Sequence, residues 1–191
     1  MRALFQEPLV VPGVQFILAE LHAMKLDGVL HHVYGEAFLP TGVGQTPELR
    51  AAALALAVPA SLAKRAIVGQ LSAAWIYGCA PSPQPLALLL DSGGKSALLP
   101  PLSGCSLRQV HVSPAEVSEL AGAHVTNPLR TAVDVARSAP LPVARAVLEA
   151  MAAQPELACS VGAIMAELSG AAHVPGRIRG LALLRGMGTG S

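Results

Sequence analysis

The triplet Gly94-Lys95-Ser96 is the first candidate for chemistry, because these residue types end the loop that cradles phosphates in P-loop nucleotide-binding proteins. That loop needs another glycine five residues before Gly94, where this chain has Leu89, and it must lead straight into a helix. Here a pair of prolines follows at 100–101 instead of a helical pattern. The sequence therefore predicts a polar hairpin turn over 91–96 and no nucleotide site.

Histidine and cysteine residues are the next candidates, as metal ligands. His31 and His32 are neighbours on an expected strand, so their side chains point to opposite faces and cannot easily share one ion. Cys79, Cys105 and Cys159 lie far apart and form no CxxC pair. We therefore expect no metal site. We expect the three thiols to be free, reduced and partly buried, as is usual in cytosolic proteins.

The residues of hydrolytic enzymes are present but not in a catalytic arrangement. The stretch 68–72 (VGQLS) lacks the second glycine of the Gly-x-Ser-x-Gly nucleophile elbow. The carboxylates are few and scattered, and neither Lys64 nor Lys95 has the acidic partners of a nuclease motif. The sequence predicts a protein that is not an enzyme and that has no cofactor.

Arg130 and Asp134 are four residues apart in the segment NPLRTAVDVA, and on a helix they would face each other across one turn. One interpretation is a local ion pair worth a few tenths of a kcal/mol. The other is a structural polar node that fixes this helix against the strands.

Composition limits the classes of protein that these elements can form. The chain has 191 residues, of which 52% are hydrophobic and 13% charged, so it can bury a core and is not expected to be disordered. Its net charge is +1, which argues against tight non-specific nucleic-acid binding. Aromatic residues are only 3%, so we expect modest stability or stabilisation by self-association as a homo-oligomer. No secretory signal or membrane span is evident, which indicates a soluble cytoplasmic protein.

The first part of the chain has the order of elements that ends a winged helix-turn-helix. After an irregular arm over 1–13, a helical period over 14–27 is followed by Gly28 as a C-cap. Strands are expected over 29–34 and 37–39, around a turn at 35–36. Near this helix and hairpin, the few positive or titratable residues that could contact phosphates are Arg2, Lys25, His31 and His32.

The remainder predicts a mixture of strands and helices. Thr46 and Pro47 open a helix that continues to about 57. Strands are expected over 66–68, 86–90, 106–112 and 122–125, and helices over 70–78, 113–120, 126–138, 143–153, 160–168 and 177–184. The fold class is therefore α+β, with a partial N-terminal winged helix followed by a small mixed sheet packed with helices. We divide the chain into an arm plus winged-helix-like segment (1–42), an α/β domain (43–186) and a frayed tail (187–191).

Four further segments are informative when taken together: AELHAMKLDGVLHHVYGEAFLP (19–40), TPELRAAALALAVP (46–59), QLSAAWIYG (70–78) and VTNPLRTAVDVA (125–136). In this order they resemble the AbiEi-like antitoxin family of actinobacterial type IV toxin–antitoxin systems. Their order and spacing match over nearly the whole chain. Related longer chains continue into an endonuclease-like domain, which we do not expect after Arg185.

The resemblance implies a winged-helix segment that binds operator DNA, and an α/β domain that opposes a nucleotidyltransferase-type toxin. Carried over by position, 14–27 would hold the recognition helix, with Gln15, Glu20, His22 and Lys25 as its exposed residues. Residues 29–39, with His31 and His32, would form the wing. The partners expected on this basis are duplex DNA and a cognate toxin protein. The alternative is a non-enzymatic protein-interaction module whose DNA-binding segment is degenerate.

Overall fold

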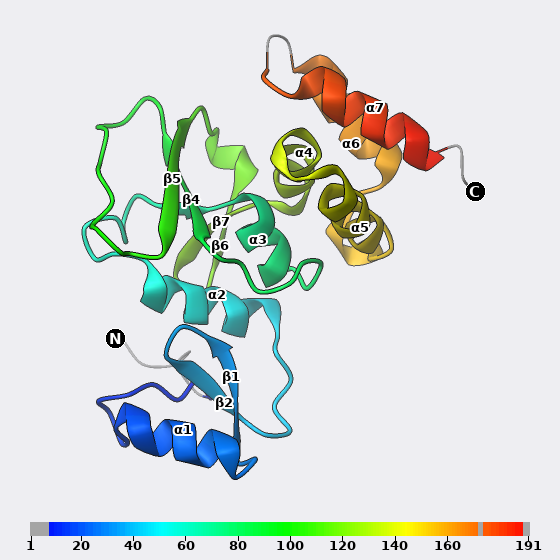
Figure 1. Ribbon diagram of the computed structural model, residues 1–191. Coiled ribbons are helices and arrows are strands. Elements are labelled where there is room, and N and C mark those ends of the chain that lie inside the picture. The colour runs from blue at the N-terminus through cyan, green and yellow to red at the C-terminus, as the bar shows by residue number, and fades with distance from the viewer. Residues whose placement is uncertain (1–7, 172–173, 189–191) are drawn as a thin grey trace.

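The computed structural model describes residues 8–171 and 174–188 and has the predicted α+β class (Figure 1). A helix and a two-stranded hairpin form one end of the molecule, and a five-stranded sheet with the remaining helices forms the rest. Residues 1–7 of the expected arm lie outside the described residues.

The N-terminal helix α1 spans Leu18–Leu26 and starts four residues later than the sequence period predicts. Gly13 has a φ of +86°, and the Glu20 carboxylate accepts a hydrogen bond from Ile17 N at 2.8 Å, which sets the start of the helix. Gly28, with a φ of +74°, follows the C-cap as predicted. The arm is not wholly irregular, since Val10 pairs with Phe38.

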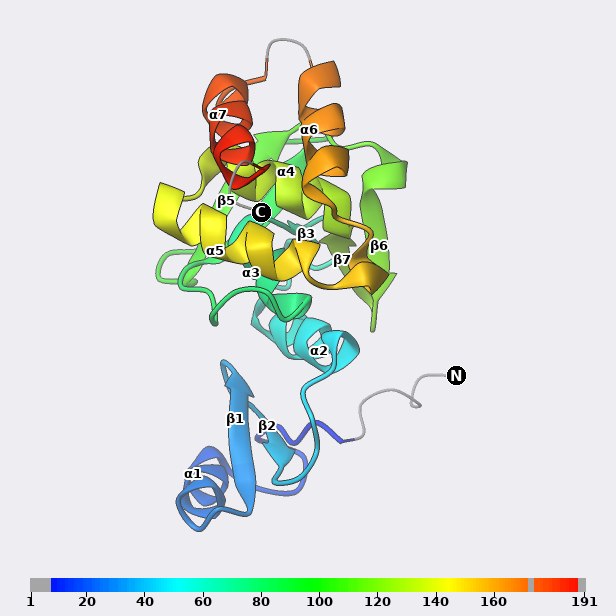
Figure 2. The same ribbon diagram turned by 90° about the vertical axis from the view of Figure 1, so that its right-hand side faces the viewer.

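The hairpin consists of β1 (Leu30–Tyr34) and β2 (Ala37–Pro40), close to the predicted strands. Its two faces bury different residues. On one face Leu30 and Phe38 pack with Leu21 of α1 in a small separate core. On the other face Val33 and Leu39 join the main core. The hairpin is therefore packed between α1 and α2 (Pro47–Ala57), as Figures 1 and 2 show.

The sheet has the order β5-β4-β3-β7-β6 and is mixed, as predicted. Strand β3 (Ile67–Val68) runs parallel to β7 (Ala123–Thr126) and antiparallel to β4 (Leu86–Asp91). Strand β5 (Cys105–Val110) runs parallel to β4, so the predicted hairpin turn over 91–96 is wrong. A parallel pair cannot be joined by a tight turn, and the long loop 92–104 makes this connection.

A second correction concerns the helix predicted over 113–120. The capping box at Ser113 and Glu116 is present, but it closes only the short 3-10 turn η1 (Pro114–Glu116). Strand β6 (Val117–Leu120) follows and pairs antiparallel with β7. Ala121 and Gly122 both have left-handed φ values, of +47° and +79°, which turn the chain back within two residues. Pairing with β7 therefore outweighs the helical start signal.

Five further helices follow, of which one packs against the sheet and the other four pack beyond it. They are α3 (Gln70–Ile76), α4 (Pro128–Ser138), α5 (Leu141–Ala152), α6 (Val161–Gly170) and α7 (Arg177–Gly188), with the short turn η2 (Pro155–Leu157) between α5 and α6. Pro142 lies in the first turn of α5, where proline is tolerated, so this helix starts two residues before the predicted start at 143. Helix α7 runs through Gly188, so two residues of the predicted tail are helical. Residues 189–191 lie outside the described part of the chain.

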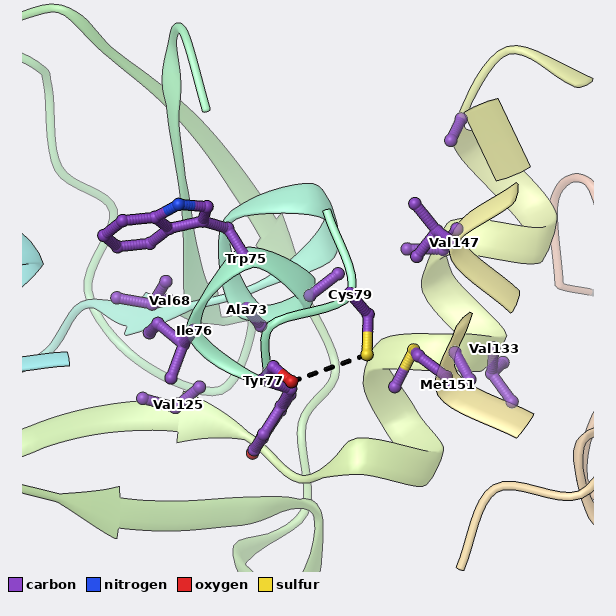
Figure 3. Close-up of a cluster of buried hydrophobic side chains, with 14 of the residues drawn as sticks. Val68, Ala73, Trp75, Ile76, Tyr77, Cys79, Val125, Val133, Val147 and Met151 are labelled. Atoms are coloured by element: carbon purple, nitrogen blue, oxygen red, sulfur yellow. Dashed lines mark hydrogen bonds between the residues drawn. The ribbon is translucent and has the colours of Figure 1, made fainter. Parts of the chain in front are cut away.

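The main core joins the sheet, α2 and α3 to the C-terminal helices. Figure 3 shows Trp75 and Ile76 of α3 beside Val68, with Val147 and Met151 of α5 across the cluster. The helices are closely packed at Gly180 of α7, where an added Cβ would lie 2.7 Å from a side-chain carbon of α6. Small residues at such positions let the helix backbones approach one another.

Candidate functional site

The residues expected to bind DNA do not all share one surface. The rings of His22 and His32 both lie edge-on against the buried Phe38, each with a centroid distance of 5.5 Å. Lys25 is exposed about one turn after His22 on the same helix. The structure thus places His22 and His32 together beside Phe38, with Lys25 close by on α1.

Two predicted residues are separated from this group. Gln15 is exposed but lies in the turn before α1, because the helix begins later than expected. His31 pairs with Leu39 on the face of the hairpin that packs towards α2, and is half-buried. His31 therefore cannot share a ligand surface with His32.

The hairpin tip is docked on the α/β domain rather than projecting as a free wing. His32 Nε2 donates to Gly35 O at 2.8 Å within the turn. Tyr34 Oη donates to Pro83 O at 3.2 Å, and its ring lies 5.7 Å from that of Trp75. These contacts fix the tip, so α1 is the element of this unit that is most open to a macromolecular ligand.

The charge of the helix–hairpin unit, residues 8–42, is negative. It contains one lysine, Lys25, against the three carboxylates Glu20, Asp27 and Glu36, which gives −2 with histidine neutral. Four large apolar side chains of this unit are also exposed, namely Val14, Ile17, Leu26 and Val29. Phosphate contacts by this surface are therefore few.

Arg130 and Asp134 are in contact, as their spacing on a helix predicted, and they belong to a network that extends beyond one helix. Arg130 Nε donates to Asp134 Oδ2 at 3.0 Å, while its Nη1 donates to Glu116 Oε1 at 2.8 Å and to His111 O at 3.2 Å. Arg137 Nη1 contacts Asp134 Oδ1 at 3.3 Å, and its Nε donates to Pro175 O. The network thus ties α4 to η1 and to the loop before α7.

Burial and the neighbouring positive charges shift the pKa values of the two carboxylates of this network in opposite directions. Burial raises the pKa of Asp134, and the neighbouring Arg130 and Arg137 offset only part of that effect. Burial also acts to raise the pKa of Glu116, but hydrogen bonds from the Ser113 amide and from Arg130 outweigh it and hold that pKa below its ordinary value. Asp134 is the more deeply enclosed member, at 6% exposure.

A groove of about 1040 Å³ runs beside this network. Leu89, Arg108 and Val110 line it from the sheet, on the face opposite to the main core. Helix α4 lines it with Leu129, Arg130, Val133, Asp134 and Arg137, and Gln70 lines it from the first turn of α3. Sequence reasoning missed this groove, because its residues come from segments with no shared motif.

Neither a cluster of metal ligands nor a membrane-spanning helix is found in the described part of the chain. Within residues 8–171 and 174–188, no three His, Cys, Asp or Glu side chains cluster where they could hold a metal ion. None of the helices in those ranges has the length and apolar character that crossing a bilayer requires. The three cysteines are free, and Cys79 and Cys159 are buried.

No protein-family model matches this chain, and no curated protein matches it at a significant level.

Proposed function

We propose that this chain is a non-catalytic cytoplasmic regulator of the antitoxin type, which binds duplex DNA through α1. Its α/β domain would bind a partner protein, a nucleotidyltransferase-type toxin if the resemblance to AbiEi-like antitoxins holds. The observation that carries the proposal is the position of α1, at the end of the molecule and anchored through one face only (Figures 1 and 2).

Because α1 is anchored through one face only, His22 and Lys25 on the remaining surface of the helix are accessible. Leu21 is fully buried against the hairpin, whereas His22 and Lys25 are exposed. An α-helix presented in this way fits the major groove of B-form DNA, whose base edges carry a distinct pattern of donors and acceptors. His32, next to His22 across the Phe38 ring, would lie at the flank of the same surface.

The charge of the unit determines what kind of DNA binding to expect. Each phosphate neutralised by a lysine or arginine contributes about −0.9 to the slope of log K against log salt concentration. With Lys25 as the only lysine in residues 8–42, we expect a slope of roughly −1 per bound chain at neutral pH. Affinity would be modest and would depend on base contacts and on self-association.

A second candidate function is a protein-interaction module whose helix–hairpin unit no longer binds DNA. The net charge of −2 and the exposed apolar residues around α1 favour this function. The partner would present an apolar surface with basic residues around it, because such a surface complements an acidic unit.

Fluorescence anisotropy with duplex DNA from the chain's own upstream region distinguishes the two functions. A scrambled duplex of equal length serves as the control, and both are titrated at low and near-physiological salt. Preference for the upstream duplex, lost in Lys25→Ala/His32→Ala, supports the DNA-binding regulator. Absence of binding to either duplex at low salt refutes it and favours the interaction module.

A further inference from the structure

We propose that the groove between the sheet and α4 binds an organic phosphate monoester of nucleotide size. This site is separate from α1, and the inference does not depend on DNA binding. It rests on three arginines that line one groove, on the donors they retain, and on an apolar floor.

The first argument is the supply of unused donors. Arg130 and Arg137 use their Nε and Nη1 atoms in contacts with the protein, while no hydrogen bond from either Nη2 is found among the described residues. Arg108 is exposed and makes no ion pair or side-chain hydrogen bond in that part of the chain. Guanidinium groups match phosphate oxygens in geometry and charge, so the three together form a suitable phosphate-binding surface.

The second argument is that two of the three carboxylates that line the groove are engaged. Glu116 and Asp134 each bond to an arginine, so they hold the guanidinium planes in position. Glu167 of α6 also lines the groove, so the three arginines of the groove are balanced in formal charge by three carboxylates. Arg108 is the arginine of this groove without a carboxylate partner in the described ranges, so its charge is available to an anion.

The third argument is the shape and floor of the groove. Its volume of about 1040 Å³ is at the upper end of the range for small-molecule sites, which is roughly 300–1000 Å³. Leu89 and Val133 lie buried behind its wall, and the half-buried Val110 and Leu129 offer apolar area to a planar ring. A small inorganic anion would leave this area unused.

The backbone conformation of Gln70 is a further observation, and packing alone does not explain it. Its φ of +54° lies in the left-handed region, which costs a non-glycine residue about 1 kcal/mol or more and is often retained where function requires it. Gln70 lines the groove, and its side-chain amide has no hydrogen bond among the described residues. An amide there can donate to a phosphate or to a ring nitrogen of the ligand.

Isothermal titration calorimetry of the full chain with AMP, inorganic phosphate and adenosine tests the proposal. AMP should bind with a stoichiometry of one, phosphate should bind more weakly, and adenosine should give no saturable signal. Arg108→Ala should weaken AMP binding at least about tenfold, since hydrogen bonds to charged groups are the strong ones. The matched control is Arg145→Ala, an exposed arginine of α5 outside this groove, which should stay within twofold of wild type.

Three results would overturn the proposal. They are no AMP binding at millimolar concentration, equal binding of AMP and adenosine, and AMP binding that Arg108→Ala leaves unchanged. Equal affinity for phosphate and AMP would refute the assignment to a ligand of nucleotide size. Because Arg108 lies far from α1 in the fold, binding of duplex DNA by Arg108→Ala should match wild type, which keeps this test independent of the regulator function.

Discussion

Removal of the Arg130 side chain should destabilise the protein more than removal of any exposed arginine. Its side chain is only 11% exposed and contacts Glu116 at 2.8 Å and Asp134 at 3.0 Å. In Arg130→Ala both carboxylates lose a partner, and Asp134 stays buried with Arg137 alone at 3.3 Å. Removing one member of a buried ion pair costs about 3–5 kcal/mol, because the other charge is left without compensation.

We expect the lower end of that range, roughly 3 kcal/mol, since Arg137 still neutralises part of the Asp134 charge. For a chain of this length, each kcal/mol lowers Tm by about 2–4 °C, which gives a decrease of roughly 6–12 °C. Arg130→Met keeps the aliphatic volume and should give nearly the same decrease, because the cost comes from the carboxylates rather than from a cavity.

Arg145→Ala is a matched control, because Arg145 and Glu149 form an i,i+4 pair of the same type as Arg130 and Asp134. That pair is long, at 3.8 Å, and its side chains are 45% and 58% exposed. Exposed pairs of this kind contribute about 0.3–0.5 kcal/mol at most. Thermal unfolding followed by circular dichroism measures both variants. If Arg130→Ala unfolded at the same temperature as Arg145→Ala, the argument that burial makes this network important to stability would be wrong.

Three other predictions concern the packing and the titrating groups. Because the pKa of Glu116 is lower in the folded chain than its ordinary value of 4.5, its stabilising effect is present above about pH 4.5 and is lost as pH falls through the folded-state pKa. Glu116→Gln should therefore lose its stability difference from wild type as urea unfolding is measured at lower pH, and a constant difference would contradict the assignment. Gly180→Ala should cost about 1–3 kcal/mol through overpacking, whereas Gly186→Ala in the same helix meets its nearest atom at 3.5 Å and should be neutral or stabilising in the same urea assay. Burial raises the pKa of Tyr77 to about 12, and its hydroxyl donates to Thr126 O at 2.8 Å. Tyr77→Phe should cost about 1 kcal/mol and remove a tyrosinate absorbance step near pH 12, and an unchanged titration would show that the step belongs to another tyrosine.

Elements with strong local signals could be predicted from the sequence. Thr46 caps α2 and accepts from Leu49 N at 3.3 Å, and Asn127 caps α4 in the same way, because cap residues act through hydrogen bonds two or three positions away. The hairpin of β1 and β2 also follows from a local alternation around Gly35. The spacing of Arg130 and Asp134 predicted their contact, since helix geometry alone determines it.

Elements that depend on pairing between distant segments could not be predicted in the same way. Ala121 adopts a left-handed φ that its residue type does not favour. A turn was expected at Gly122, but strand β6 before it was not, because the local signal at 113–116 was that of a helix start. The parallel arrangement of β4 and β5 depends on the long loop between them, whose path carries no local signal. The groove also depends on segments that are distant in the sequence, because Arg108, Glu116 and Arg137 converge from a strand, a 3-10 turn and a helix.

The central claim, that α1 binds duplex DNA, is tested most directly by the salt dependence of binding in a matched pair of variants. Lys25→Ala removes the one lysine of the helix–hairpin unit, and Lys64→Ala removes an exposed lysine from the α/β domain. Binding of the upstream duplex is measured by anisotropy over a series of salt concentrations. The account predicts a slope of roughly −1 for wild type and for Lys64→Ala, and a slope smaller by about 0.9 with weaker binding for Lys25→Ala. Identical slopes and affinities for all three proteins, or no binding by wild type at low salt, would contradict it.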